Sequence, residues 1–535
     1  MTLRPDLRDA ALRWIADDPD PATRSELQQV LAAAMVGTEG AVEELADRMS
    51  GMLRFGTAGL RGPVRAGPSG MNVAVVRRAT AGLAAWLARG GERGTVVVGR
   101  DARHGSAAFA TAAADVLAGA GFAVRMLPGP LPTPVLAFAV RELGAVAGVQ
   151  ITASHNPPAD NGYKVYLGDG AQLAPPSDAE IEAAIAAAPA AVTIPTAATA
   201  TEADVTEAYL ERVARLPRGT ARTLRVALTP MHGVGGATAV HALHRAGFTD
   251  VHVVAAQAAP DPDFPTVTFP NPEEPGATDA LLALAADVDA DLAIALDPDA
   301  DRCALAVPTA GGWRMLTGDE TGVLLGDHLL RSGGFADPLV ATTVVSSSML
   351  RSVAEAHGAR YAETLTGFKW IVRGGPGLVY GYEEALGYCV DPEAVRDKDG
   401  IAAAVLACDL AATLKAAGRG LPDRLDELAV AHGVHLTEGV SLRMDPDVRD
   451  AAAARLRADP PQGWTSELPA PDVLVLRRPG ERFVVRPSGT EPKLKAYLEV
   501  VEPVADAAAL AAAREGAQAR LDALRAEVTS LLAAP

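Results

Sequence analysis

The chain has 535 residues, too many for one hydrophobic core, so its length predicts three or four domains. Hydrophobic residues make up 49% and charged residues 21%, which is typical of a globular protein, and the net charge of −18 argues against nucleic acid or an anionic membrane surface as a partner. The first residues lack the apolar run of a secretory signal, and no stretch of about 20 residues is apolar enough to span a membrane. The three cysteines, odd in number and without metal-ligand spacing, predict buried free thiols in a reducing compartment, so we expect a cytoplasmic protein.

Residues 1–50 predict an N-terminal helical cap, with Leu7, Ala11, Leu12 and Ile15 on one helix face. Three α/β units follow, because short β-rich runs alternate with Ala-rich helical stretches. The predicted strands are 95–99, 123–127 and 145–152, then 224–229, 251–255 and 291–296, then 339–345, 359–364 and 378–380. The last unit has a different order and predicts an α+β domain. We place the domains at 51–216, 217–327, 328–435 and 436–535.

Lysine is scarce in this chain, since only six of its 48 basic residues are lysines. Arginine cannot lose its proton in a protein whereas lysine can titrate, so a retained lysine indicates a position where arginine would not serve. Lys164, Lys369 and Lys493 fall in the segments described below, Lys495 lies two residues beyond one of them, and Lys398 and Lys415 lie elsewhere.

The segment Thr-Ala-Ser-His-Asn-Pro at 152–157 follows a predicted strand and places Ser154 and His155 in a polar loop. The carboxyl end of a strand is where open α/β sheets bind ligands, although an ordinary hydrogen-bonded turn is the plain alternative. Asn161-Gly162 is a turn dipeptide that predicts a hairpin, which would bring Lys164 back toward the serine.

The segment Asp-Pro-Asp-Ala-Asp-Arg at 297–302 follows another apolar strand. Three carboxylates at alternate positions of a tight loop can converge on one hard cation, and a solvated acidic loop is the alternative. An EF-hand is excluded, because its sixth and twelfth positions would be Arg302 and Pro308.

Other loops carry groups that suit phosphates and sugars. Residues 486–493, Arg-Pro-Ser-Gly-Thr-Glu-Pro-Lys, combine a guanidinium, hydroxyls and a glycine, as phosphate loops do. The glycine-rich segment 55–62 matches no nucleotide-binding motif. Adjacent carboxylates in the glycine-bounded segment 381–387 suit vicinal sugar hydroxyls, and 366–369 adds Thr-Gly-Phe-Lys in the same unit.

Together these motifs resemble those of the α-D-phosphohexomutase superfamily (phosphoglucomutases, phosphomannomutases and relatives), in the same order from about residue 50 to 500. The resemblance implies four domains around a central cleft, three similar α/β domains and a C-terminal α+β domain. It also implies a small phosphosugar substrate, one Mg²⁺ per chain, and a sugar bisphosphate as activator or intermediate. We expect a monomer or homodimer.

The resemblance implies a role for each matching residue. Ser154 would be the phosphoserine, with His155, Lys164 and Arg61 as further catalytic residues and Lys164 as the foremost proton carrier. Asp297, Asp299 and Asp301 would bind Mg²⁺ together with Ser154. The implied substrate-binding residues are Thr57, Arg302, Thr366, Lys369, Glu383, Lys398, Arg486, Ser488, Gly489 and Thr490.

The chain departs from the common family pattern in its sugar loop, where Glu383-Glu-Ala385 replaces Glu-x-Ser, and Tyr388 and Cys389 stand where a histidine is often found. These features look more like the branch that contains α-phosphoglucomutases and phosphopentomutases. The expected enzyme is an isomerase that moves a phosphoryl group between the 1- and 6-positions of glucose or mannose. The alternative is a phosphopentomutase.

Two other function classes fit the sequence less well. A haloacid-dehalogenase-type phosphatase also has Asp-x-Asp after a strand, but its motif continues with Thr or Val where this chain has Asp301. A non-catalytic sugar-phosphate-binding protein would not need the serine and the aspartates that this chain retains.

Overall fold

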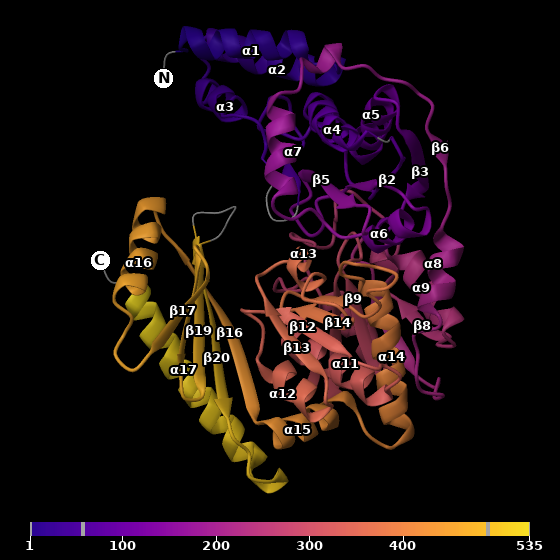
Figure 1. The fold of residues 1–535 in the computed structure, drawn as a ribbon, viewed down its shortest axis with the longest axis vertical. Helices are drawn as coiled ribbons and strands as arrows, with labels where there is room; N and C mark the ends of the chain where they lie inside the picture. Colours follow the sequence, from indigo (N-terminus) through magenta and orange to yellow (C-terminus); the bar gives the residue numbers. More distant parts are fainter. Residues whose placement is uncertain (1–2, 55–58, 92, 488–492, 534–535) are drawn as a thin grey trace. The chain divides into compact units, whose positions relative to one another are not determined.

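The computed structural model describes residues 3–54, 59–91, 93–487 and 493–533 (Figure 1). The chain divides into two units, which we describe separately. Unit 1 comprises Met1–Leu216, Arg225–Cys303 and Glu393–Val405, and unit 2 comprises Pro217–Leu224, Ala304–Pro392 and Leu406–Pro535.

Unit 1 begins with the helices α1 (Pro5–Asp17), α2 (Pro21–Met35) and α3 (Ala41–Arg48). Asp20 caps α2 by accepting a hydrogen bond from the backbone N–H of Ala22, and Pro21 occupies the first helical position. The predicted helical cap is therefore present. Of the residues predicted to share one helix face, Ala11 and Ile15 are buried, whereas Leu12 is 50% exposed.

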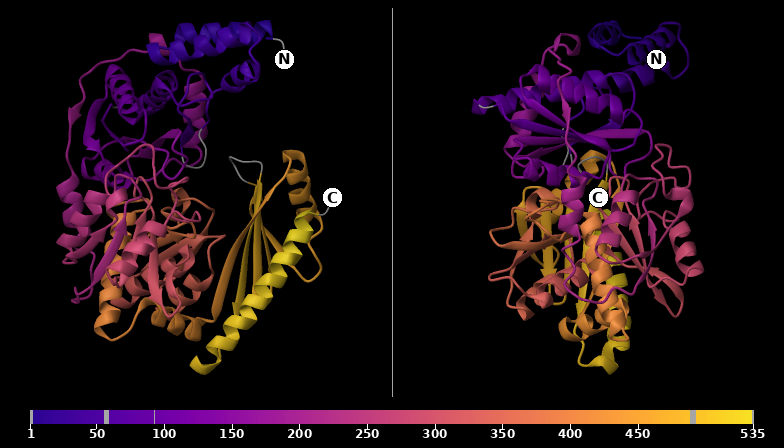
Figure 2. Two further views of the ribbon diagram at one scale, coloured as in Figure 1. Left: turned by 180° about the vertical axis from the view of Figure 1, so that it is seen from behind. Right: turned by 90° about the vertical axis from the view of Figure 1, so that its right-hand side faces the viewer.

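A six-stranded sheet follows, in the order β1-β5-β4-β2-β3-β6. The strands β2, β3, β4 and β6 run parallel, while β5 is antiparallel to both β4 and β1. Helices α4, α5 and α7 share one core with the sheet, and α6 lies on its other face (Figures 1 and 2). The elements are β1 (Leu60–Pro63), α4 (Val73–Leu87), β2 (Thr95–Arg100), α5 (Ser106–Gly119), β3 (Ala123–Pro130), α6 (Thr133–Glu142), β4 (Ala147–Ile151), β5 (Asp160–Leu167), α7 (Ser177–Ala186) and β6 (Thr201–Glu202).

The rest of unit 1 is a second α/β layer, in which β7 pairs in parallel with β8 and β9. The β9 residues are buried throughout, as expected for a parallel strand covered on both faces. The elements are α8 (Thr206–Val213), β7 (Arg225–Thr229), α9 (Gly236–Arg245), β8 (Asp250–Val253), α10 (Asp279–Asp287) and β9 (Leu292–Leu296).

Unit 2 contains the sheet β13-β12-β14-β15, in which β12 is parallel to β13 and β14. A hairpin of β10 and β11 precedes it. The elements are β10 (Cys303–Thr309), β11 (Gly312–Met315), α11 (Gly318–Ser332), β12 (Leu339–Thr343), α12 (Met349–Ala356), β13 (Arg360–Thr364), α13 (Phe368–Ile371), β14 (Leu378–Glu383), β15 (Gly387–Cys389), α14 (Gly400–Ala416, whose first residues belong to unit 1) and α15 (Leu421–His432).

The C-terminal domain of unit 2 is an antiparallel sheet, β16-β20-β19-β18-β17, with the long helix α17 along one face (Figure 2). Its elements are β16 (Val434–Arg443), α16 (Pro446–Ala458), β17 (Thr465–Ala470), β18 (Val473–Arg478), β19 (Glu481–Pro487), β20 (Lys493–Glu502) and α17 (Leu510–Ala533). The predicted class, three α/β domains and an α+β domain, is thus confirmed. The domain boundaries given above stay a prediction.

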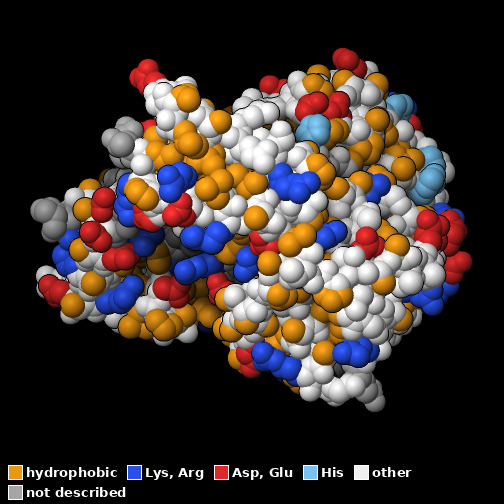
Figure 3. Space-filling model, turned by 90° about the horizontal axis from the view of Figure 1, so that it is seen from above, with side chains coloured by type: hydrophobic (Ala, Val, Ile, Leu, Met, Phe, Trp, Pro, Cys, Tyr) orange, Lys and Arg blue, Asp and Glu red, His pale blue; other side chains and the backbone are white. Residues whose placement is uncertain are grey.

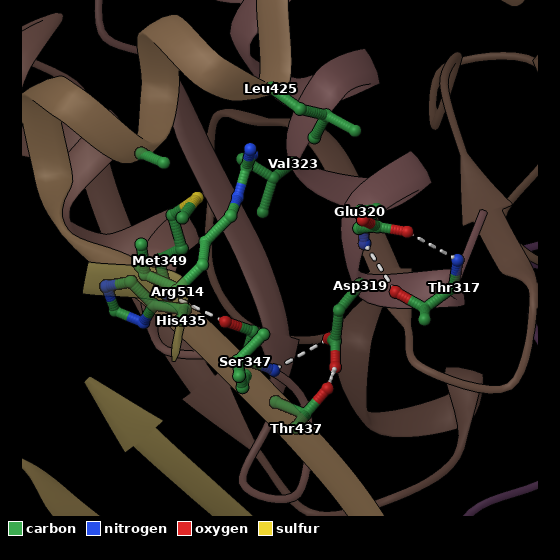
Figure 4. Close-up of a pocket in the computed structure, with 13 residues that line it drawn as sticks. Thr317, Asp319, Glu320, Val323, Ser347, Met349, Leu425, His435, Thr437 and Arg514 are labelled. Atoms are coloured by element: carbon green, nitrogen blue, oxygen red, sulfur yellow. Dashed lines mark hydrogen bonds between the residues drawn. The ribbon is translucent and has the colours of Figure 1, made fainter. Parts of the chain in front are cut away.

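A pocket of about 140 Å³ lies where α11, α15, β16 and α17 meet in unit 2 (Figure 4). Asp319 in its wall accepts hydrogen bonds from the Ser347 N–H at 2.7 Å and the Thr437 hydroxyl at 2.7 Å, and so ties β16 to the α/β domain. Thr317 and Glu320 form a capping box at the start of α11. The pocket wall is therefore held by polar contacts from three elements.

Acidic, basic and apolar side chains are interspersed over the face drawn in Figure 3. Among the described residues no single helix has the length and apolar character needed to cross a membrane, although α14 and α15, bent by 89°, meet that test as a pair. The three cysteines are buried free thiols, as predicted.

Candidate active site

Ser154 lies in the loop between β4 and β5 and is 2% exposed. Its hydroxyl donates to Asp297 Oδ2 at 2.8 Å, and its Oγ lies 3.2 Å from His155 Nδ1. The backbone φ of Ser154 is +53°, in the left-handed region that non-glycine residues rarely adopt. The serine is therefore held in a strained, well-defined position beside a carboxylate from the second α/β layer.

The predicted hairpin exists, but its turn is not where the sequence indicated. Asn161 and Gly162 lie inside β5, opposite β1, and residues 152–159 form the connection instead. The register pairs Lys164 with Gln150 on β4, so the lysine does return beside the serine loop. The assignment of Asn161-Gly162 to the turn was wrong.

The loop after β9 gathers Asp297, Asp299 and Asp301, all at most 1% exposed. Each offers a carboxylate oxygen, and these oxygens lie within 4.8 Å of one another. Asp299 Oδ1 and Asp301 Oδ1 are buried and have no hydrogen-bond partner within the part of the chain that the structure describes. Orphaned carboxylate oxygens are costly unless a cation binds them, so the cluster fits a hard metal ion such as Mg²⁺.

Two lysines balance part of this negative charge. Lys164 Nζ lies 2.7 Å from Asp299 Oδ2 and 2.8 Å from Asp301 Oδ2, and Lys398 Nζ lies 3.4 Å from Asp301 Oδ2. Burial alone would lower the pKa of Lys164, but the two carboxylates outweigh it and raise that pKa above its ordinary value. Lys164 is therefore a cation in this arrangement.

The three aspartates do not share the charge equally. Burial, followed by the charges of Asp299 and Asp301, raises the pKa of Asp297 well above its ordinary value. For Asp299, burial acts in the same direction, but Lys164 prevails and lowers its pKa. The cluster thus holds its negative charge mainly on the carboxylates that face the lysines.

The remaining predicted residues of unit 1 surround the serine loop. Arg61 on β1 donates to Asn156 Oδ1 at 3.1 Å, and the Arg302 backbone N–H donates to Asp297 Oδ1 at 3.0 Å. Burial, then the positive charges of Arg302 and Arg61, lower the pKa of His155 well below 6.5, so its ring is neutral. Thr57 lies outside the described residues.

In unit 2 the structure brings two predicted substrate residues together. Arg486 at the end of β19 donates to the Thr366 hydroxyl at 2.9 Å and to the Tyr497 hydroxyl at 3.2 Å. Lys369 on α13 is 9% exposed, and its Nζ lies 5.8 Å from the centre of the Trp370 ring. Ser488, Gly489 and Thr490 lie outside the described residues.

The sugar-loop glutamates differ in their surroundings. Glu383 ends β14, where it pairs with Gly387 of β15. Its neighbour Glu384 accepts hydrogen bonds from the Ser346 hydroxyl at 2.9 Å and the Thr343 hydroxyl at 3.2 Å. Glu384 therefore holds the loop through these hydrogen bonds, and sugar binding by Glu383 stays a prediction.

Two residues that the sequence interpretation did not single out also contact the site. Thr133 at the start of α6 donates its hydroxyl to Asp299 Oδ2 at 2.5 Å and its N–H to the Asp299 carbonyl at 2.9 Å. Arg103, in the loop after β2, donates to the carbonyl oxygen of Ser154 at 2.7 Å. Their position in the sequence was the available signal: each lies three residues beyond the end of a strand parallel to β4, β2 for Arg103 and β3 for Thr133, and so at the same sheet edge.

Comparisons with known proteins agree with this arrangement. Family profiles described as "Phosphoglucomutase/phosphomannomutase, alpha/beta/alpha domain" I, II and III match residues 52–191, 207–312 and 317–430, and the "C-terminal domain" profile matches 466–517. The chain is 42% identical over 451 residues to a Haemophilus influenzae protein named "Probable phosphomannomutase", covering 80% of this chain and 93% of that protein.

Two further proteins are similar to this chain. A Saccharomyces cerevisiae protein named phosphoribomutase is 36% identical over 450 residues, covering 76% of this chain and 71% of that protein. A crystal structure of a phosphoglucomutase/phosphomannomutase family protein from Burkholderia thailandensis has a TM-score of 0.69 at 21% identity, covering 87% of this chain and 96% of that one. The last comparison concerns the fold alone.

Proposed function

The chain belongs to the phosphoglucomutase/phosphomannomutase family of phosphosugar mutases, which are isomerases, and we propose that its reaction runs through a phosphorylated Ser154. The single observation that supports this role best is the contact of the Ser154 hydroxyl with Asp297 Oδ2 at 2.8 Å, inside a cluster of buried carboxylates. A serine there can carry a phosphoryl group next to a bound cation. Family membership also favours a mutase over the phosphatase and the binding-protein alternatives.

We assign Asp297, Asp299 and Asp301 to hold Mg²⁺, one ion per chain, together with an oxygen at Ser154. The orphaned oxygens of Asp299 and Asp301 support this assignment. When bound, Mg²⁺ would neutralise charge on the phosphoryl group. Phosphoryl transfer depends mainly on alignment and on such neutralisation, so the site needs little further covalent chemistry.

Each half-reaction exchanges one bond for another. The bond between Ser154 Oγ and phosphorus breaks, a bond from phosphorus to a sugar hydroxyl oxygen forms, and the hydroxyl proton ends on Ser154 Oγ. The resulting sugar bisphosphate is the intermediate, and it would also serve as activator by phosphorylating Ser154. In the second half-reaction the other phosphoryl group returns to Ser154 Oγ, which gives up its proton to the sugar oxygen.

We propose Lys164 as the residue that carries this proton. Its raised pKa means that it enters the cycle protonated and can donate before it accepts. His155 is neutral and 3.2 Å from Ser154 Oγ, and Arg61 fixes Asn156 in the same loop. His155 lies beside the serine hydroxyl, and Arg61 adds positive charge without competing for the proton.

The other substrate residues would contact the reacting phosphoryl group, the sugar or the non-reacting phosphate. Arg302 and Lys398 are suited to charge on the reacting side, and Thr366, Lys369 and Glu383 to the sugar. Arg486, with Ser488, Gly489 and Thr490, would bind the non-reacting phosphate. Thr57 would join the reacting side. Two properties of these residues support the assignments. Cationic and hydroxyl side chains bind the oxygen atoms of phosphates, and the residues match the family motifs.

We propose a hexose phosphate, of glucose or mannose, as the substrate. A pentose phosphate is the second candidate, because Ala385 removes a hydroxyl from the sugar loop and because a phosphoribomutase is among the relatives. A cytoplasmic location and a monomer or homodimer stay predictions.

The test is phosphorylation of the wild type and of Ser154→Ala by glucose 1,6-bisphosphate, followed by intact mass. We expect one phosphate on the wild type, none on the variant, and no mutase turnover by the variant. Ser332→Ala, a serine on α11 whose hydroxyl donates to the His328 carbonyl, is the matched control and should behave as the wild type. An active Ser154→Ala enzyme would refute the assignment.

A further inference from the structure

Arg103 is 4% exposed and points its guanidinium at the backbone of the serine loop. Its Nη2 donates to the Ser154 carbonyl at 2.7 Å and to the Asn156 carbonyl at 2.6 Å. Its Nη1 donates to the Pro157 carbonyl at 2.8 Å and to the Asp160 carbonyl at 3.1 Å. One side chain thus binds four carbonyl oxygens along the connection between β4 and β5.

Asp101 and Phe264 hold Arg103 itself in place. Asp101 Oδ1 accepts from the Arg103 backbone N–H at 2.9 Å, and Asp101 Oδ2 lies 3.6 Å from Arg103 Nε. The Phe264 ring, with its centre 5.0 Å away, covers the guanidinium from the second α/β layer of unit 1. Asp101 also accepts from the Ser106 hydroxyl at 2.6 Å, and Ser106 accepts from Asn161 Nδ2 at 2.8 Å. This network therefore holds the start of β5 as well as the loop.

The loop needs such support because of its own backbone. Ser154 has a φ of +53°, and a non-glycine residue keeps this strained backbone conformation only where the surrounding structure holds it. On the amide side, the Ser154 N–H donates to the Thr152 hydroxyl at 2.9 Å, which restrains one side of the residue. Arg103 restrains the carbonyl side with a charged donor. Lysine offers three donors on a flexible stem and cannot match a planar fork bound to four acceptors.

We propose that Arg103 is the positioning residue for the phosphoryl-carrying serine: it holds the loop so that Ser154 Oγ stays beside Asp297. The inference rests on the proposed function, since it assumes that Ser154 accepts the phosphoryl group. Arg103 acts through the loop and touches no reacting atom. Loss of its fork frees Ser154 to relax from the strained conformation and moves its Oγ away from the carboxylates.

The experiment measures single-turnover phosphorylation of Ser154 by glucose 1,6-bisphosphate, by quenched-flow and intact mass, in Arg103→Lys and Arg103→Ala. A misplacement of about 1 Å lowers a rate by on the order of a hundredfold, and we expect a loss of that size in both variants. Half-saturation by the bisphosphate should change little. Ethylguanidinium should accelerate Arg103→Ala in a saturable way, because it can occupy the vacated space and donate to the same carbonyls.

The control is Arg48→Lys, which replaces a largely buried unit 1 arginine that donates to the Ala66 carbonyl and to Glu26, outside the serine loop. It should be phosphorylated as fast as the wild type. Mg²⁺ binding by calorimetry and the thermal midpoint report whether each variant is folded. If Arg103→Ala does not fold, Arg103→Lys decides the question.

A folded Arg103→Lys that is phosphorylated at the wild-type rate overturns the inference. So does a slow variant whose Mg²⁺ affinity and stability fall in the same proportion, or an Arg103→Ala rate that ethylguanidinium leaves unchanged, because a general structural role would then suffice. A wild type that takes no phosphate on Ser154 would instead overturn the proposed function.

Discussion

Replacing Lys164 with methionine tests how the carboxylate cluster is balanced. Lys164 is 2% exposed, and its Nζ lies within 2.8 Å of oxygens of both Asp299 and Asp301. Methionine keeps most of the length and removes the charge. Breaking a buried ion pair costs about 3–5 kcal/mol, because the remaining charge is left buried and unpaired. Lys398, 3.4 Å from Asp301, compensates in part, so we expect about 3 kcal/mol, the low end of that range.

Calorimetry in EDTA measures this loss as a lower thermal midpoint of unit 1. A loss of 1 kcal/mol lowers the midpoint of a unit of this size by roughly 2 °C, so we expect a decrease of about 6 °C. Mg²⁺ supplies the positive charge that the variant lacks, so it should raise the midpoint of Lys164→Met more than that of the wild type. Lys415→Met, which removes an exposed lysine from α14, controls for the change in net charge.

Two results would refute this reasoning. If Lys164→Met and the wild type unfold at the same temperature in EDTA, the ion pairs do not stabilise the fold. If Mg²⁺ raises both midpoints equally, the lysine and the metal do not balance the same carboxylates.

Three further predictions follow from single contacts. Thr133→Val should weaken Mg²⁺ binding about tenfold by calorimetry, whereas Thr133→Ser should not, because the hydroxyl orients Asp299; equal affinities would contradict this. Burial raises the pKa of Glu499, but Arg482 outweighs it and lowers that pKa to about 2, from an ordinary 4.5. Ionised Glu499 therefore stabilises unit 2 fully above pH 4.5, and about 3 kcal/mol of this stabilisation is lost as the pH falls through the folded-state pKa. Urea titrations at a series of pH values should show that the free energy of unfolding of Glu499→Gln depends less on pH than that of the wild type. Ala385→Ser should shift kcat/KM toward hexose over pentose phosphates by about tenfold at most, and a shift toward pentoses would show the loop interpretation to be wrong.

Much of the fold follows from local patterns. Buried parallel strands read as continuous apolar runs, so the strand starting at Thr95 and the strand ending at Leu296 were predicted within a residue of their observed bounds. Polar motifs directly after such strands indicated the serine loop and the aspartate loop.

Local signals failed where tertiary pairing overrode them. Asn161-Gly162 has the composition of a turn, but these residues pair with Gly62 and Arg61 of β1 and so lie inside a strand. Pairing with β1 holds these residues on one side, the Thr152 N–H donates to the Gly162 carbonyl at 3.1 Å, and the turn moves to the preceding residues. Leu12 likewise fits the apolar periodicity of its helix but is 50% exposed.

The sequence by itself determined the chemistry: a serine beside a histidine, three alternating aspartates and a few retained lysines, each within one short segment. The tertiary structure decided which of these groups touch. The contacts of Ser154 with Asp297, of Lys164 with Asp299, and of Arg103 with the serine loop join residues separated by about 50 to 140 positions. Such contacts depend on strand order and on how two sheets present their carboxyl edges, and no local propensity encodes that arrangement.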